Sequence, residues 1–367
     1  MLMSQLSLED YKMEGTISNL CIRAPREKAE TLRRALQRLE ILDQSRRITA
    51  SNGFVLIPIT RNLSPDEMNV IAKLSQVEVI RSELPSPPTR PKNLISALDG
   101  TLPPHLLALL PRSFDIVGDI AIIEDLAPEL LPHGEILAKA MMQVHPRVRT
   151  VLLKTGKVEG DFRIPSFAVL AGEEKYETIH TEYGVKLKVD LSKAYFSSRL
   201  ATEHHRVASQ VRDSEIVVDM FAGVGPFSIM IAKKVSAKVF SIDINPNAIA
   251  LLKESLRLNR LKGEVIPFCG DVRIIAPRLK GVADRVIMNL PASSLDYLDV
   301  AIATLKSCGG TIHIYLFAKD DPIKNAKEMF NSRLNGQVKK CEVLNSRIVK
   351  PVAPREWQVV IDALVVP

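Results

Sequence analysis

The sequence predicts an α/β protein whose C-terminal part folds as a doubly wound, Rossmann-like sheet. From about Arg206 onward, short runs rich in β-branched residues alternate with amphipathic helical stretches. This alternation is typical of parallel strands joined by helical crossovers. Residues 216–227, IVVDMFAGVGPF, form the first unit: a buried strand, an acidic strand end, a glycine turn and a helix start at Pro226. The last two apolar runs, 339–349 and 356–366, predict a final antiparallel pair.

The regions before this sheet are organised differently. Residues 1–81 contain two strand-like runs and two helical stretches, which predict a small α+β module. Residues 82–93 hold four prolines and have the composition of a stiff linker. Residues 94–205 mix short helices with strands and predict a second α+β domain, and residues 206–367 form the sheet domain.

Composition excludes several classes of protein. No uncharged apolar run reaches the length of a membrane span, and the N-terminus lacks a signal-peptide pattern. The four cysteines are scattered without paired spacing, so neither a zinc site nor a disulfide framework is predicted. We therefore expect a cytoplasmic protein that binds no metal and makes no membrane contact.

The balance of charge is basic. The chain has a net charge of +7 and a pI near 9.1, which is compatible with a polyanionic partner. Part of this charge falls on the first predicted helix and the loop after it, where it forms either a solvated face or a phosphate-contacting face. The sequence does not favour one of these over the other. The residues concerned are Arg26, Lys28, Arg33, Arg34, Arg38, Arg46 and Arg47.

Polar residues end the first four predicted strands of the sheet. Because the carboxyl ends of parallel strands open onto one crevice, these residues should converge on one ligand. A carboxylate on the second strand can bind both ribose hydroxyls, and on the third the Asp271 side chain and the Val272 N–H can bind an adenine. Each residue alone is also a common turn former, but four in succession favour a ligand site. The four are Asp219, Asp243, Asp271 and Asn289.

The glycine turn lacks the lysine of a P-loop and the third glycine of a dinucleotide-binding turn. Together with the strand ends and the final antiparallel pair, it resembles class I S-adenosylmethionine-dependent methyltransferases. A longer set of motifs resembles the archaeal and eukaryotic tRNA guanine-37 N1-methyltransferase family. This resemblance covers most of the chain, including a small N-terminal module like that of the archaeal members. The motifs are YFSSRLATE at 195–203, IDINP at 242–246, GDVR at 270–273, MNLPASS at 288–294 and VKPVAPRE at 349–356.

The resemblance implies S-adenosylmethionine as cofactor, tRNA as partner and methyl transfer to N1 of guanosine-37, by an enzyme that we expect to be a monomer. The N-terminal module would hold the tRNA body, and the other two domains the anticodon loop. Glu203 would take the N1 proton and Arg163 would stabilise O6. Without the resemblance, Glu203 would be interpreted as a helix-surface carboxylate and Arg163 as part of an interdomain salt bridge. The implied cofactor contacts are Tyr195, Phe196, His204, Asp219, Phe221, Gly223, Gly225, Asp243, Ile244, Asp271, Val272, Asn289 and Pro291.

The sequence at residues 291 and 292 bears on which atom is methylated. Pro291 and Ala292 stand where amino-methylating enzymes carry an aromatic residue, which argues against adenine N6 and for a ring nitrogen or carbon as the target.

Two alternative functions remain compatible with the sequence. A wyosine-pathway enzyme of the same scaffold would instead methylate C7 of a tricyclic guanosine derivative or transfer an aminocarboxypropyl group. A non-catalytic RNA-binding protein with a degenerate fold is disfavoured by the intact set Asp243, Asp271 and Asn289.

Overall fold

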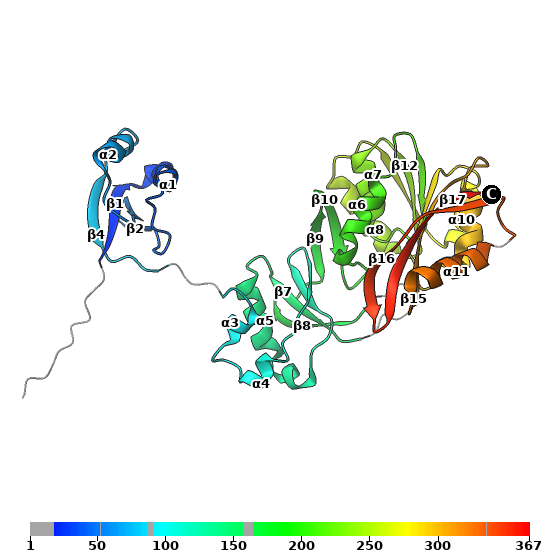
Figure 1. The fold of residues 1–367 in the computed structure, drawn as a ribbon, viewed down its shortest axis with the longest axis horizontal. Helices are drawn as coiled ribbons and strands as arrows, with labels where there is room; N and C mark the ends of the chain where they lie inside the picture. Colours follow the sequence, from blue (N-terminus) through cyan, green and yellow to red (C-terminus); the bar gives the residue numbers. More distant parts are fainter. Residues whose placement is uncertain (1–17, 52, 87–90, 157–163, 335) are drawn as a thin grey trace, which may run out of the picture. The chain divides into compact units, whose positions relative to one another are not determined.

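The computed structural model describes residues 18–51, 53–86, 91–156, 164–334 and 336–367. The chain divides into two compact units, residues 1–90 and residues 91–367 (Figure 1). The second unit contains the sheet to which the glycine turn belongs.

The first unit is a small α+β module in which helices pack on an antiparallel sheet. Its strands lie in the order β2-β3-β1-β4, and β1 pairs with both β3 and β4. Ile22 and Ile57 of the sheet share a buried core with Leu32 and Ile71 of the two helices. The elements are β1 (Asn19–Pro25), α1 (Ala29–Arg38), β2 (Thr49–Ser51), β3 (Phe54–Pro58), α2 (Pro65–Ala72) and β4 (Glu78–Ser82), with a 3-10 turn at Arg26–Lys28.

The sequence predicted the helices of this module and its central strands, and it missed the edge strands β2 and β4. The predicted capping box at the start of α2 is confirmed, because the Glu67 N–H donates to Ser64 Oγ at 3.3 Å and the Ser64 N–H donates to Glu67 Oε2 at 2.8 Å. The edge strands are short, so their alternation of polar and apolar residues is too brief to recognise. They form because β1 and β3 each offer an edge to pair with.

The second unit begins with a mixed sheet that confirms the predicted α+β character. Its strands lie in the order β5-β6-β7-β8, with β6 and β7 parallel and the other pairs antiparallel. Leu137 and Met141 of α5 are buried against Val151 of β7. The elements are α3 (Leu94–Leu98), α4 (Pro104–Leu107), β5 (Asp115–Val117), β6 (Ile120–Ile123), a 3-10 turn (Pro128–His133), α5 (Gly134–Val144), β7 (Thr150–Lys154) and β8 (Phe167–Gly172).

A hairpin of β9 (Glu177–Glu182) and β10 (Val185–Asp190) follows, with its turn at the predicted EYG segment. Gly184 in this turn has φ of +79°, a conformation that favours glycine. The inward side chains of β10 share one buried core with residues of β11 and α7. The same core includes Val117 and Ile120 of the mixed sheet, so the hairpin packs against both sheets, and the predicted boundary between residues 205 and 206 stays a prediction. The inward side chains of β10 are Val185, Leu187 and Val189.

The large sheet has the predicted doubly wound topology with a final antiparallel pair. Its strands lie in the order β13-β12-β11-β14-β15-β17-β16. Strands β11 to β15 are parallel, whereas β17 is antiparallel to both β15 and β16. The strands are β11 (Ile216–Asp219), β12 (Lys238–Asp243), β13 (Glu264–Cys269), β14 (Arg285–Met288), β15 (Gly310–Lys319), β16 (Lys340–Ala353) and β17 (Glu356–Val366). The helices are α6 (Ala201–Ala208), α7 (Pro226–Lys234), α8 (Pro246–Arg257), α9 (Val272–Ile275), α10 (Leu298–Thr304) and α11 (Pro322–Leu334).

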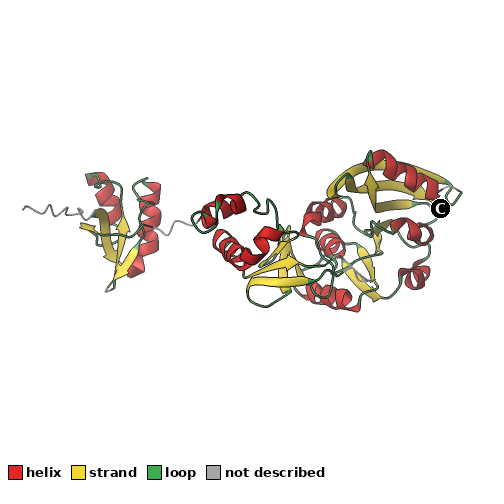
Figure 2. Ribbon diagram, turned by 90° about the horizontal axis from the view of Figure 1, so that it is seen from below, coloured by secondary structure: helices red, strands yellow, loops and turns green. Residues whose placement is uncertain are grey.

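Helices cover both faces of this sheet (Figure 2). Val217 belongs to a buried cluster with Phe227 of α7, whereas its neighbour Val218 belongs to a cluster with Leu298 of α10 and Phe330 of α11. Successive side chains of a strand point to opposite faces, so a short apolar run such as β11 requires cover on both sides. This arrangement leaves the carboxyl ends of the parallel strands as the accessible edge.

No helix among the described residues combines the length and the apolar character needed to cross a bilayer. No group of three or more His, Cys, Asp or Glu side chains among them is placed to hold a metal ion.

Candidate active site

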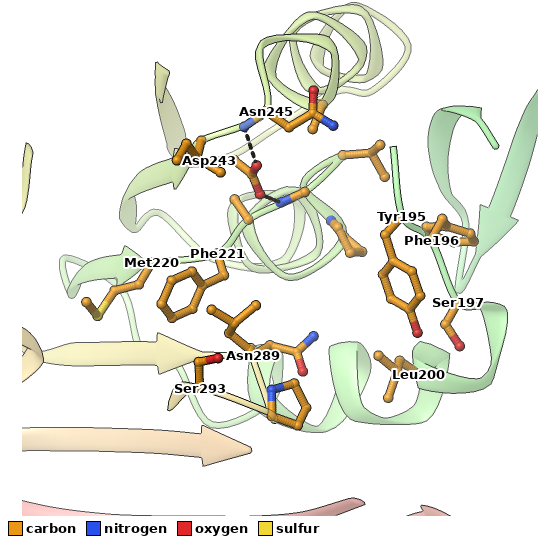
Figure 3. A pocket seen from close by; sticks show the side chains of 18 of the residues that line it. Tyr195, Phe196, Ser197, Leu200, Met220, Phe221, Asp243, Asn245, Asn289 and Ser293 are labelled. Atoms are coloured by element: carbon orange, nitrogen blue, oxygen red, sulfur yellow. Dashed lines mark hydrogen bonds between the residues drawn. The ribbon is translucent and has the colours of Figure 1, made fainter. Parts of the chain in front are cut away.

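A cavity of about 550 Å³ opens where the strand order reverses, between β11 and β14. This is the position at which open α/β sheets bind ligands. Figure 3 shows Asp243 beside the glycine turn, with Tyr195 and Asn289 facing the same open space. The predicted cofactor contacts that line the cavity are Tyr195, Phe196, His204, Phe221, Gly223, Asp243, Ile244, Asp271, Val272, Asn289 and Pro291.

Gly223 and Gly225 of the turn are required for different structural reasons. Gly223 has φ of +55°, and a Cβ placed on it would meet only the Tyr195 carbonyl oxygen, at 3.9 Å. Its backbone is therefore open to a ligand. Gly225 has φ of +84°, and its Cβ would lie 2.8 Å from Leu252 Cγ of α8. Gly225 does not line the cavity, and it is required for the packing of α7 on α8.

Asp243 is anchored by the turn that it faces. The Gly223 N–H donates to Asp243 Oδ2 at 2.7 Å, and the Asn245 N–H donates to Oδ1 at 2.9 Å (Figure 3). Burial raises the pKa of this carboxyl group above its usual range, and the two backbone hydrogen bonds oppose the rise. Each oxygen can accept a further hydrogen bond, so the pair can bind two adjacent hydroxyl groups.

Asp219, predicted as another cofactor contact, does not line the cavity. Its side chain is fully buried, and its Oδ2 accepts a hydrogen bond from Ser228 Oγ at 2.7 Å. Ser228 in turn accepts from Ser241 Oγ at 2.7 Å, which connects β11, α7 and β12. Burial raises the pKa of Asp219 to about 7, with a further contribution from the charge of Asp243. Asp219 thus stabilises the packing of β11, α7 and β12 around the glycine turn without lining the cavity.

The third and fourth strand ends contribute to the cavity wall and also have structural partners. Asp271 caps α9 by accepting from the Arg273 N–H at 2.8 Å, yet it still lines the cavity. Asn289 Oδ1 accepts from Gln358 Nε2 of β17 at 3.3 Å. The turn-former and ligand-site interpretations are therefore compatible for Asp271.

His204 forms a buried pair with a carboxylate that the sequence did not reveal. Its Nδ1 lies 2.7 Å from Glu182 Oε2 of β9, and both side chains are almost fully buried. Burial favours neutral Glu182, but hydrogen bonds from His180 and His204 outweigh it and hold the pKa of Glu182 below its usual range. The His204 ring also packs edge-on against Phe227, 4.6 Å between centroids. These contacts fix the orientation of a ring that lines the cavity.

Glu203, the predicted base, does not line the cavity. It lies in the first turn of α6 and is 2% exposed, so it is not the surface carboxylate that its position alone would predict. Its Oε2 accepts from Tyr315 Oη at 2.9 Å and from Arg206 Nε at 3.0 Å. Arg347 of β16 forms an ion pair with the same carboxylate. Glu203 therefore lies beneath the wall that its neighbour His204 forms.

A chain of buried polar groups continues from Glu203 across the sheet. Arg206 donates to both carboxylate oxygens of Asp362, the second at 3.1 Å, and His313 Nδ1 lies 2.6 Å from Asp362 Oδ1. Arg285 Nη1 lies 2.7 Å from His313 Nε2. Because arginine only donates, His313 accepts at Nε2 and donates its Nδ1–H to Asp362. Arg206, which donates a hydrogen bond to Glu203, is therefore itself fixed in position by Asp362, and Asp362 is fixed by His313.

Comparisons with known proteins agree with this geometry. Residues 178–344 match the TRM5/TYW2 methyltransferase domain, residues 94–175 the TYW2 N-terminal domain and residues 21–67 the tRNA methyltransferase 5 N-terminal domain. A relative from Pyrococcus abyssi, named tRNA (guanine(37)-N(1))-methyltransferase Trm5b, is 39% identical over 94% of this chain and 98% of its own length. The chain belongs to the TRM5/TYW2 methyltransferase family.

Solved structures and a further relative are also similar over most of this chain. The crystal structure of Trm5b from Pyrococcus abyssi has a TM-score of 0.67 and 38% identity, covering 95% of this chain and 99% of that one. A solved complex of aTrm5 and tRNALeu has a TM-score of 0.67 and 33% identity, covering 94% and 99%. The tRNA 4-demethylwyosine(37)-methyltransferase Taw21 of Saccharolobus solfataricus is 35% identical over 68% of this chain and 93% of its own length. The predicted family and Rossmann-like methyltransferase fold are confirmed.

The C-terminal strands of this TRM5/TYW2 family member supply cavity residues that the sequence did not single out. Phe317 of β15, Lys350 of β16 and Gln358 of β17 all line it. For Lys350 a signal was present, because a lysine in the otherwise apolar run IVKPVA requires a reason to be there. Arg163, predicted to stabilise O6, lies outside the described residues.

A second cavity of about 190 Å³ adjoins the first. Both are lined by Tyr195, Ser197 and Lys350, so these residues form the wall between them. The far side of the second cavity comes from the mixed sheet and includes Asp115 and Glu124. The two domains of the second unit thus meet beside the methyltransferase crevice.

Proposed function

We propose that this protein transfers a methyl group from S-adenosylmethionine to N1 of guanosine-37 in tRNA. One observation carries the proposal: the cavity at the switch point joins an open glycine, Gly223, to an anchored carboxylate, Asp243, in a chain of the TRM5/TYW2 family. The relatives that are similar over nearly its whole length are named for this reaction.

The residues present fit the cofactor. Asp243 can accept hydrogen bonds from both ribose hydroxyls, while the Asp271 side chain and the Val272 N–H can form hydrogen bonds with the adenine edge. His204 and Tyr195 line the cavity beside the glycine turn, where the amino-acid end of the ligand would lie. S-adenosylmethionine supplies a methyl group activated by a sulfonium ion.

The protein must remove the N1 proton of the guanine and stabilise the negative charge that then develops. We propose Glu203 as the base that takes the N1 proton. Tyr315 and Arg206 hold its carboxylate by hydrogen bonds, and the next residue in the sequence, His204, lines the cavity. Glu203 lies beneath that wall, so substrate binding must turn its carboxylate toward the base; such hydrogen bonds often align only in the complex. Arg163 remains the proposed donor to O6.

The tRNA contacts follow the division into domains. We assign residues 1–81 to the tRNA body, residues 82–93 to a linker, and residues 94–205 and 206–367 to the anticodon loop, in a monomeric, cytoplasmic enzyme. The exposed basic side chains of the first module support the contact with tRNA. These include Arg26, Lys28, Arg38 and Arg47.

Methyl transfer to tRNA transcripts tests this function. Transcripts with guanosine or another base at position 37 are incubated with purified protein and labelled cofactor, and the products are digested to nucleosides. We expect 1-methylguanosine from the guanosine transcript alone. Equal transfer to both transcripts would rule out the assignment.

A wyosine-pathway activity is the second candidate. Residues 94–175 match the TYW2 N-terminal domain, and the similar protein Taw21 is named for methylation of a wyosine precursor. Mass spectrometry of tRNA carrying the tricyclic precursor separates a methyl product from an aminocarboxypropyl product. An unchanged precursor would exclude both activities.

A further inference from the structure

The crevice has two chemically distinct halves. Because β12 and β13 lie on one side of β11, Asp243 and Asp271 mark the half for the cofactor nucleoside. The strands β14, β15, β17 and β16 follow on the other side of β11. Asn289, Lys350 and Gln358 line the crevice from these strands. They therefore face the group that receives the methyl.

Lys350 differs from the neighbouring cations of this wall. Its Nζ donates to Ser197 Oγ at 3.1 Å. Among the described residues, no carboxylate lies within ion-pairing distance of Nζ, whereas Arg199 pairs with Asp115 at 2.7 Å and Lys154 with Glu124 at 3.1 Å. Lys350 is thus a half-buried ammonium group whose hydrogen-bond partner within the described part of the chain is the neutral Ser197.

The surroundings of Lys350 strengthen its electrostatic effect. Burial lowers the pKa of the ammonium group and the nearby guanidinium of Arg199 lowers it further, while the carboxylates of Asp115 and Glu124, beyond ion-pairing distance, partly oppose this. A charge in a partly desolvated wall interacts with a nearby oxygen more strongly than one in water. An oxygen that becomes negative beside Lys350 would therefore be stabilised.

Two kinds of ligand oxygen could meet this ammonium group: a backbone phosphate or a base carbonyl. The second cavity, which Lys350 also lines, contains the ion pairs Arg199–Asp115 and Lys154–Glu124, so it offers a phosphate only the charge of Lys350 itself. On the crevice side, the amides of Asn289 and Gln358 suit the edge of a base. The surroundings therefore favour a carbonyl oxygen.

We propose that Lys350 donates a hydrogen bond to one lone pair of O6 of the target guanine, which leaves the second lone pair for the donor proposed above, and that it stabilises the negative charge that develops there. The inference rests on the proposed function. As the N1–H bond breaks, its proton passes to Glu203 and the electron pair spreads over N1 and O6. N1 forms a bond to the methyl carbon, the carbon–sulfur bond breaks with its electron pair going to sulfur, and O6 returns to a neutral carbonyl. Lys350 keeps its proton throughout.

The test compares the full-length protein with Lys350→Met, which keeps the length of the side chain and removes the charge and the donor. Single-turnover methyl transfer to guanosine-37 tRNA is measured together with tRNA binding at several salt concentrations. We expect the methyl-transfer rate to fall about 100-fold, the usual cost of losing one donor to a developing oxyanion. The dissociation constant for tRNA and its salt dependence should stay unchanged.

A matched control lies on the same strand. Lys340 is exposed, pairs with Glu342 at 3.7 Å and does not line either cavity, so Lys340→Met should retain the wild-type rate. Lys350→Gln, whose amide can still donate, should react faster than Lys350→Met. Circular dichroism and thermal melting establish that each variant is folded, and Lys350→Gln carries the test if Lys350→Met does not fold.

Two results would overturn the inference. Weaker tRNA binding with a salt slope reduced by about one, at an unchanged methyl-transfer rate, would assign Lys350 to a phosphate. A wild-type rate in both Lys350 variants would exclude any role for it in the reaction. If the wild-type protein makes no 1-methylguanosine, the proposed function itself fails, so the two failures are distinguishable.

Discussion

Replacing Asp219 with asparagine should change how the stability of the sheet domain depends on pH. In the folded protein, burial raises the pKa of this carboxyl from 3.8 to about 7. The folded state therefore binds a proton that the unfolded state has released, and the free energy of unfolding falls as pH rises through this window. The full contribution is present below the unfolded pKa and is lost as pH approaches the folded one.

The size of the effect follows from these two values. Between about pH 5 and about pH 8, the titration of Asp219 lowers the wild-type free energy of unfolding by about 2.5 kcal/mol, at about 1.4 kcal/mol per pKa unit. Asp219→Asn does not titrate, and its amide oxygen can still accept from Ser228 Oγ. The variant should therefore gain about 2.5 kcal/mol on the wild type between the two pH values.

Urea unfolding at both pH values measures this difference. Trp357, the single tryptophan of the chain, lies in β17 and reports on the sheet domain by fluorescence. Asp299→Asn removes an exposed aspartate of α10 and controls for the change in net charge. A gap between wild type and Asp219→Asn that is the same at both pH values would refute the reasoning.

Three further predictions concern the glycine turn and the proposed chemistry. Gly225→Ala should destabilise the protein by roughly 2–5 kcal/mol in urea unfolding, from a positive φ and the approach of its Cβ to Leu252, whereas a loss below about 1 kcal/mol would contradict the packing role. Asp243→Asn should weaken S-adenosylmethionine binding about 10- to 100-fold by calorimetry, because charged hydrogen bonds to the ribose are lost; unchanged affinity would remove Asp243 from the cofactor site. Glu203→Gln should lower single-turnover methyl transfer about 100-fold or more at unchanged cofactor affinity. A wild-type rate would exclude Glu203 as the base.

The layered arrangement explains why charged residues near the crevice tolerate burial. Glu203, Arg206 and Asp362 are connected by hydrogen bonds, and each lies under the wall and not in it. A buried charge is stable when it is paired and its remaining hydrogen bonds are satisfied. The same hydrogen bonds determine the conformation of the Glu203 side chain before substrate binds.

Much of the fold could be predicted from the sequence because it depends on local signals. The alternation of strands and helices, the capping box at Ser64 and the turn before Val185 each act over a few residues. Gly223 and Asp243 could be assigned to the crevice because Gly223 lies in the turn after β11 and Asp243 is the last residue of β12. The short edge strands β2 and β4 lack such a signal, since they depend on the strands that they pair with.

The individual roles within the site depended on tertiary structure. Asp219 and Asp243 both end parallel strands, but only contacts with Ser228 and Gly223 separate the buried residue from the one at the crevice. Gly225 is explained by Leu252 on the next helix, and no local pattern reveals that contact. Lys350 enters the crevice because β16 pairs with β17 and β17 with β15. Sequence patterns determine which elements form, whereas the side chains that face a shared cavity depend on how distant elements pack.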